Sequence, residues 1–147
     1  MTRPNIDEYF LEMALVVASR STCLRHSVGA VAVKSKHVLT TGYNGAPSGL
    51  RDCLELGCLR NEMNIPSSER TEICRGVHAE ENVVIQGSLY GTSLEGATIY
   101  CTHSPCRRCA KMLINAKIER FISLERYSDS EFLDLFQEAG IQFEVVR

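Results

Sequence analysis

Two short motifs constrain the fold of this chain more than any other feature, because their side chains suit a single metal ion. They are His78-Ala79-Glu80 and Pro105-Cys106-Arg107-Arg108-Cys109. One imidazole and two thiolates are ligands that zinc prefers, and a catalytic zinc site keeps its fourth position open for water. The fold must therefore bring His78, Cys106 and Cys109 to one point, with Glu80 beside it.

The second motif predicts a helix that begins at Pro105 and runs to about residue 116. Proline fits the first turn of a helix, where its missing N–H costs nothing. Cys106 and Cys109 are three positions apart, so they lie on one face of that turn. The positive end of the helix dipole lowers thiol pKa values, which favours the thiolate form that binds metal.

The first motif predicts a helix from about His78 to Gln86. Residues two apart do not share a face deep within a helix, so His78 and Glu80 must both act from its first turn. From there Glu80 can reach the open position of the metal without being a ligand. A carboxylate so placed can accept a proton from water and pass it on, which is general acid–base catalysis.

Hydrophobic periodicity elsewhere predicts helices and strands in alternation. A helix precedes each of the last three strands, which favours a five-stranded mixed sheet covered by helices, an α/β sandwich. Strands are expected at 28–33, 38–43, 97–103, 120–124 and 141–146, and a last helix at 129–139. A first helix capped by Asn5 is expected to turn one face to the core, formed by Ile6, Tyr9, Phe10, Met13 and Val17.

Length and composition favour one domain over residues 1–147. The segment 46–75 shows no sustained period and contains Cys53, Cys58 and Cys74. Compact domains rarely hold structureless loops longer than about 15 residues, so something is expected to tie this insert down.

Charge and cysteine usage narrow the class of protein. The net charge of −2 gives no sign of a broad nucleic-acid-binding surface. Pro4, Asp7, Glu8 and Glu12 interrupt the first residues, which do not resemble a signal peptide. No apolar run approaches the roughly 20 residues that span a bilayer. Seven cysteines without an export signal indicate metal ligands and buried thiols in a cytoplasmic protein.

The combined motifs resemble the signature of zinc-dependent nucleobase deaminases. Over nearly the whole chain the sequence is similar to the deoxycytidylate (dCMP) deaminase family, including bacterial late-competence proteins of the ComE operon protein 2 type. Besides the two motifs, the matching segments are 21–25, 28–31, 41–49, the insert, 74–80 and 102–112. The resemblance implies a cytidine-deaminase-like fold, a three-layer α/β/α sandwich. It also implies hydrolysis of dCMP to dUMP and ammonia, which supplies thymidylate synthesis.

The same resemblance implies roles for individual residues. His78, Cys106 and Cys109 would bind zinc and Glu80 would shuttle protons. Substrate would be bound by Asn44 at the sugar, by Ala79, and by Arg25, Ser48 and Tyr127 at the 5′-phosphate end. From the residues alone, a turn asparagine in Tyr43-Asn44-Gly45 is the alternative interpretation of Asn44. Arg25 is equally a solvated side chain, and Tyr127 a packing residue.

Four further cysteines, Cys23, Cys53, Cys58 and Cys74, have two interpretations. They are either buried free thiols or ligands of a second, structural zinc that ties down the insert, which the resemblance implies for some members. For many members it also implies hexamers that dCTP activates and dTTP inhibits, with Mg²⁺ accompanying the nucleotide effector.

Other functions remain as alternatives. A tRNA adenosine deaminase shares both motifs, but it must bind folded RNA, which a basic surface favours. Guanine and cytidine deaminases share the zinc chemistry without a phosphate pocket. A non-enzymatic role in competence has no use for the carboxylate of Glu80. A structural zinc knuckle or a redox C-x-x-C would not need both His78 and Glu80.

Overall fold

The computed structural model describes residues 2–67, 69–126 and 130–146. Within these residues, the helices and strands are α1 Ile6–Ala18, β1 Gly29–Lys34, β2 His37–Tyr43, α2 Cys53–Leu56, α3 Leu59–Glu62, the 3₁₀ turn η1 Thr71–Ile73, α4 Ala79–Tyr90, β3 Thr98–His103, α5 Arg107–Asn115, β4 Arg120–Glu125, α6 Phe132–Ala139 and β5 Gln142–Val145. No helix among the described residues is long and apolar enough to cross a membrane.

The strands form one mixed sheet in the order β2-β1-β3-β4-β5. β1 pairs antiparallel with β2 and with β3, whereas β4 is parallel to β3 and to β5. The hairpin between β1 and β2 turns at Ser35 and Lys36, whose positive φ angles of 52° and 63° match the twist of the strands. The predicted five-stranded mixed sheet is confirmed.

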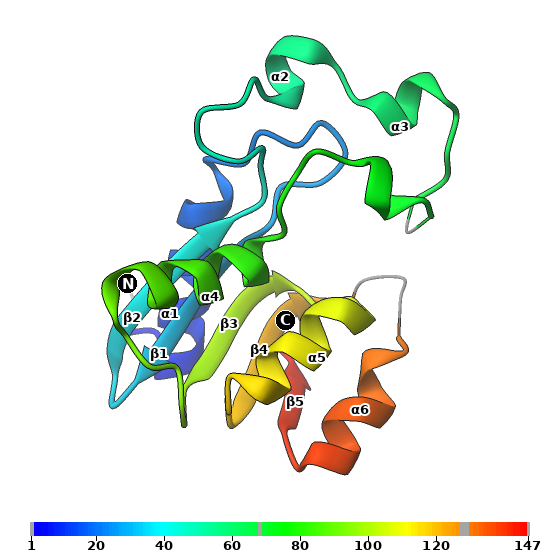
Figure 1. Ribbon diagram of the computed structural model, residues 1–147. Helices are drawn as coiled ribbons and strands as arrows, with labels where there is room; N and C mark the ends of the chain where they lie inside the picture. The colour runs from blue at the N-terminus through cyan, green and yellow to red at the C-terminus, as the bar shows by residue number, and fades with distance from the viewer. Residues whose placement is uncertain (1, 68, 127–129, 147) are drawn as a thin grey trace.

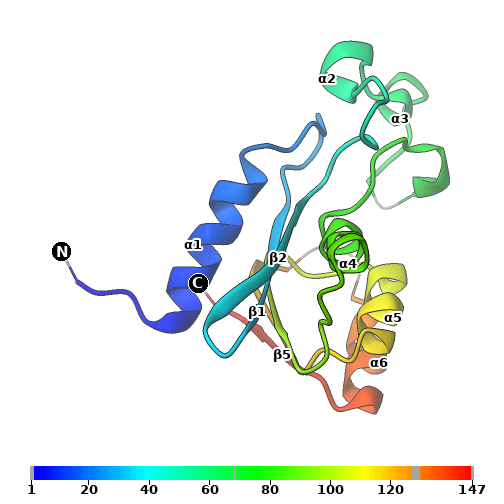
Figure 2. The same cartoon turned by 60° about the vertical axis from the view of Figure 1, so that its left-hand side comes forward.

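Helices cover both faces of this sheet, as Figures 1 and 2 show. α1 packs on one face, against β1 and β3, and α4, α5 and α6 lie on the other. Each face has its own core. Phe10 and Leu11 meet Val31, Tyr100 and Ile122 under α1. The core of the opposite face includes Ala32, Val83, Ile99, Leu113, Phe121, Phe132 and Phe136. The three-layer sandwich is therefore confirmed.

The buried face of α1 differs from the prediction. Ile6 and Tyr9 are 42% and 44% exposed, whereas Phe10, Leu11, Ala14 and Ala18 are buried. The reason is a close approach to the sheet at Gly29. A Cβ atom there would lie 2.2 Å from the Ala14 carbonyl oxygen. The helix therefore turns its small residues to β1, and the predicted stripe rotates partly into solvent.

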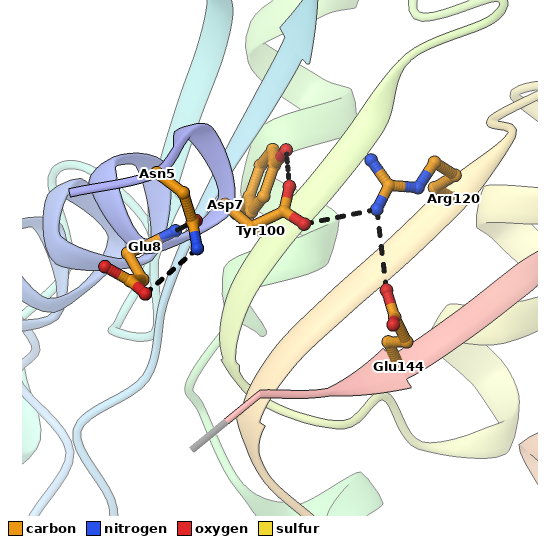
Figure 3. A network of polar contacts seen from close by, with 6 residues as sticks. All are labelled: Asn5, Asp7, Glu8, Tyr100, Arg120 and Glu144. Atoms are coloured by element: carbon orange, nitrogen blue, oxygen red, sulfur yellow. Dashed lines mark hydrogen bonds and ion pairs between the residues drawn. The ribbon is translucent and has the colours of Figure 1, made fainter.

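A polar network anchors the start of α1 to the sheet (Figure 3). Buried Tyr100 on β3 donates its hydroxyl proton to Asp7 Oδ1 at 2.6 Å. Arg120 on β4 lies 3.4 Å from Asp7 Oδ2 and 3.5 Å from a carboxylate oxygen of Glu144 on β5. Burial, and then the Asp7 carboxylate, raise the pKa of Tyr100, which keeps its proton. One helix and three strands are thereby joined.

Two helix boundaries correct the sequence prediction. α4 continues past Gln86 to Tyr90 and ends at Gly91, whose φ of 69° favours glycine. α5 begins at Arg107 rather than Pro105, because Cys106 is the N-cap residue and its sulfur accepts the Cys109 N–H.

The last helix and the insert also differ from the sequence prediction. α6 begins at Phe132, and the predicted start at Asp129 lies outside the described residues. The insert contains α2, α3 and η1, which are too short to show a period in the sequence. Asp52 caps α2 by accepting the Glu55 N–H at 3.1 Å.

Candidate metal centre and active site

Two helix starts carry the metal-binding side chains. His78 is the N-cap residue of α4, and Cys106 is the N-cap residue of α5, which follows the end of β3. The Glu81 side chain accepts the His78 N–H at 2.9 Å, which holds the first turn of α4 in place. Glu80 is the second residue of this helix, so it lies in the first turn, as predicted.

The three predicted zinc ligands converge. His78 Nδ1 lies 3.6 Å from the sulfur of Cys106 and 3.3 Å from that of Cys109. Among the described residues these three donor atoms form a group that lies within 4.8 Å and could hold a metal ion. An imidazole and two thiols with this spacing suit tetrahedral zinc, with one position left for water.

Protonation within this group also suits a cation. Hydrogen bonds from Cys109 and from His78 lower the pKa of Cys106 to about 4, so Cys106 is a thiolate. The hydrogen bond to Cys106 raises the pKa of His78 to about 9, and a hydrogen bond to the same sulfur raises the pKa of Cys109. The shared protons therefore stabilise one negative sulfur. A divalent cation replaces those protons and satisfies all three donors at once.

Glu80 lies beside the metal group in a nearly dry position. It is 5% exposed. Burial raises the pKa of its carboxyl group to about 7, although the neighbouring His78 opposes this shift. A carboxyl group with this pKa gains and loses a proton readily near neutral pH. Such a value is the one that general acid–base catalysis requires.

A close contact between β2 and α4 sets the position of Glu80. A Cβ atom at Gly42 would lie 2.3 Å from the Ala79 carbonyl oxygen and 2.7 Å from the Val83 nitrogen. Only glycine lets the first turn of α4 approach the strand so closely. Asn82 secures the same contact by donating to the Tyr43 carbonyl at 2.8 Å.

A cavity of about 410 Å³ opens over the metal group. Its walls come from the segment after α1, the end of β2, the insert, and the starts of α4 and α5. The carboxylate among its lining residues is Glu80, whereas five side chains are basic: Arg25, Arg60, Arg107, Arg108 and Lys111. The cavity therefore favours an anionic ligand that reaches the metal group.

The predicted substrate residues do not all lie at this cavity. Asn44, Ala79 and Arg25 line it. Ser48 is exposed and is not among the lining residues. Tyr127 lies outside the described residues.

The amide of Asn44 is already engaged with the backbone. Its Oδ1 accepts the Val28 N–H at 2.9 Å, and its Nδ2 donates to the His26 carbonyl at 2.9 Å. These bonds shape the segment 26–28 at the cavity wall. One amide hydrogen and one lone pair are left over for a ligand.

The four remaining predicted ligands lie near one another. Burial, and then the thiols of Cys74, Cys58 and Cys23, raise the pKa of Cys53. Backbone N–H groups of Arg25 and Gly76 donate to the sulfurs of Cys23 and Cys74 at 3.4 Å. Among the described residues, the group of three metal-ligand donors that lie within 4.8 Å of one another is formed by His78, Cys106 and Cys109. None of these four cysteines belongs to such a group.

Two further side chains that line the cavity, His103 and Arg60, differ in how far the sequence points to them. His103 lies at the end of β3, where its Nε2 is 3.4 Å from Glu125 and burial lowers its pKa. Its position three residues before Cys106 in the sequence indicates that it is close enough to interact with substrate. Arg60 carried no signal, because its burial depends on how the insert folds.

Comparison with known proteins identifies the family. Residues 4–125 match the model of the cytidine and deoxycytidylate deaminase zinc-binding region. The chain is 37% identical over 147 residues to ComE operon protein 2 of Bacillus subtilis, covering 99% of this chain and 74% of that protein. It is 41% identical over 127 residues to the deoxycytidylate deaminase of Mycobacterium phage D29, covering 83% of this chain and 96% of that protein.

A solved structure shares the fold along the whole chain. It is the dCMP deaminase of cyanophage S-TIM5 in complex with dCMP and dUMP, with a TM-score of 0.83 and 28% identity, covering 99% of this chain and 100% of that one. The chain spans only 44% and 45% of the deoxycytidylate deaminases of fission and budding yeast that it matches. From its sequence, its fold and its His-Cys-Cys group, the chain belongs to the cytidine and deoxycytidylate deaminase family.

Proposed function

We propose that this protein is a dCMP deaminase, which converts dCMP and water to dUMP and ammonia. The observation that carries the proposal is buried Glu80 beside the His78–Cys106–Cys109 group, at the base of a cavity with basic walls. Three relatives that are 34%, 36% and 41% identical to the chain are deoxycytidylate deaminases. The relative solved with dCMP and dUMP has the same fold.

The residues of the site divide the reaction between them. His78, Cys106 and Cys109 would hold zinc, and a bound zinc would supply an activated water for attack on the pyrimidine ring. Glu80 accepts a proton from the attacking water and delivers it to the ring nitrogen. The same carboxylate then takes the second proton of that water, from the new hydroxyl on the ring carbon, and passes it to the amino group, which leaves as ammonia. One group can perform each transfer because its pKa of about 7 suits both directions.

The remaining cavity residues orient the nucleotide. The free amide hydrogen and lone pair of Asn44 are suited to a sugar hydroxyl. Ala79 lies at the start of α4 and is fully buried, so it forms an apolar wall for the base. Arg25 is suited to the 5′-phosphate. Ser48 and Tyr127 stay predictions for the same end of the nucleotide.

A panel of substrates tests this assignment. Ammonia release is measured with dCMP, CMP, deoxycytidine, guanine and a tRNA at equal enzyme concentration. We expect kcat/KM for dCMP to exceed that for deoxycytidine by about 10³-fold or more, because a site built for phosphate leaves charged groups unpaired without it. Equal efficiency on deoxycytidine would move the protein to the cytidine deaminases. Activity on tRNA alone would favour the adenosine deaminases.

We also propose that Cys23, Cys53, Cys58 and Cys74 bind a second, structural zinc. Support comes from the influence of three of these thiols on Cys53 and from the backbone N–H groups that point at two of the sulfurs. Metal analysis is then expected to find two zinc ions per chain, and Cys53→Ser to retain one. The melting temperature of Cys53→Ser is also expected to fall, because the insert regains conformational freedom when it loses this zinc. One zinc per chain in both proteins contradicts the second site.

The family resemblance supports further proposals for the whole protein. Residues 1–147 are proposed to form a single deaminase domain that supplies dUMP for thymidylate synthesis in the cytoplasm. The proposed assembly is a homo-oligomer, with a hexamer favoured. In this assembly dCTP, accompanied by Mg²⁺, would activate the enzyme and dTTP would inhibit it.

A further inference from the structure

Arg60 on α3 is an unusual residue for a short surface insert, because its side chain is buried. The residue is only 9% exposed and lines the cavity. One Nη atom donates to the Pro66 carbonyl at 3.3 Å, whereas its buried Nε finds no hydrogen-bond partner among the described residues. A guanidinium with an unused donor therefore lies in the cavity wall.

Arg25 reaches the same part of the insert from the segment after α1. Its Nε donates to Oδ1 of Asn61, the residue that follows Arg60, at 2.6 Å. Its Nη2 donates to the Ile65 carbonyl. Its Nη1 is buried and has no partner among the described residues. Arg25 thus holds α3 over the cavity and adds a second unused donor. Figures 1 and 2 show α2 and α3 beyond one end of the sheet.

Neither of these arginines has a carboxylate partner within the described part of the chain. The ion pairs there that involve insert arginines join Arg51 to Glu55 and Arg70 to Glu72, and all four side chains are more than half exposed. A buried guanidinium without a counter-ion is costly. The insert therefore pairs two of its exposed arginines with carboxylates, whereas Arg60, which faces the cavity, has no such partner among the described residues.

We propose that Arg60, together with Arg25, binds the 5′-phosphate of the substrate, so that the insert is the element that selects nucleotides over nucleosides. Planar guanidinium groups match phosphate geometry and form charge-assisted hydrogen bonds with it. This inference rests on the proposed dCMP deaminase function. It gives α3 a positioning role that goes beyond closing the cavity.

The test compares Arg60→Met with Arg51→Met, a matched change at an exposed arginine of the same insert. For each protein kcat/KM is measured with dCMP and with deoxycytidine. We expect Arg60→Met to lower the preference for dCMP over deoxycytidine by about 10²-fold, mainly through KM, because the phosphate loses a buried charged partner. Arg51→Met is expected to keep the wild-type preference. Inorganic phosphate is expected to inhibit wild type competitively and Arg60→Met more weakly.

Different results separate the possible failures. The inference is overturned if Arg60→Met keeps the wild-type preference for dCMP over deoxycytidine. It is also overturned if kcat/KM falls by the same factor with both substrates. If Arg60→Met does not fold, Arg60→Lys decides, since it keeps the stem and charge but loses the planar fork. If Arg60→Lys lowers the preference for dCMP about tenfold, the inference is supported. If the preference is unchanged in Arg60→Lys, the inference is overturned. Wild-type protein that does not deaminate dCMP instead overturns the proposed function.

Discussion

Replacing Glu80 with glutamine is expected to abolish turnover of dCMP while zinc remains bound. Glutamine has the shape of the carboxyl group but cannot carry a proton, so every transfer between water, ring nitrogen and ammonia loses its carrier. General acid–base catalysis alone is worth about 10²–10⁴-fold. The kcat of Glu80→Gln is therefore expected to fall by at least about that factor. Steady-state kinetics and zinc analysis on the same sample measure both quantities.

Stability gives an independent check on this variant. The pKa of Glu80 is raised from 4.5 to about 7 by burial. An acid with a raised pKa in the folded state loses stability as the pH rises from 4.5 through 7, because the unfolded chain ionises first. Glu80→Gln removes this cost, so the metal-free variant is expected to be at least as stable as metal-free wild type at pH 8.

The matched control is Glu95→Gln, a change at an exposed glutamate on the loop before β3. It is expected to keep wild-type kinetics, zinc content and stability. Near-normal turnover in Glu80→Gln with full zinc would contradict the assignment of proton transfer to this residue.

Replacing Cys109 with serine is expected to remove the zinc ion and lower stability. Cys109 is fully buried at the start of α5, and its sulfur lies 3.3 Å from His78 Nδ1. Serine does not supply the thiolate that zinc prefers. A metal present at 100 times its Kd stabilises a fold by about 2.7 kcal/mol, which this variant forfeits. Zinc content and denaturant unfolding in the presence of zinc measure the two effects.

Cys101→Ala is the control for this change, because Cys101 is an equally buried cysteine on β3 outside the metal-binding group. It is expected to lose stability through the small cavity left behind, but to keep its zinc. Full zinc content and activity in Cys109→Ser would exclude Cys109 as a ligand.

Local chemistry made the catalytic group predictable. Ligand types are recognisable one residue at a time, and a helix start can be recognised from a short stretch of sequence. His78, Cys106 and Cys109 therefore converge as expected, and Glu80 lies in the first turn of α4. The order of helices and strands was predictable for a similar reason, since a parallel strand needs a crossover connection. The exact helix ends were not predictable, because Cys106 caps α5 through its own sulfur.

The alternation of helices and strands and the two metal-binding motifs are encoded locally, because each depends on residues a few positions apart in the chain. Which charged residues lose contact with water depends instead on the packing of distant segments. Burial raises the pKa of Glu80 to about 7, and it leaves Arg60 in the cavity wall without a carboxylate partner among the described residues. Burial depends on contacts between segments distant in the chain, such as Arg25 and Asn61, which no local pattern encodes.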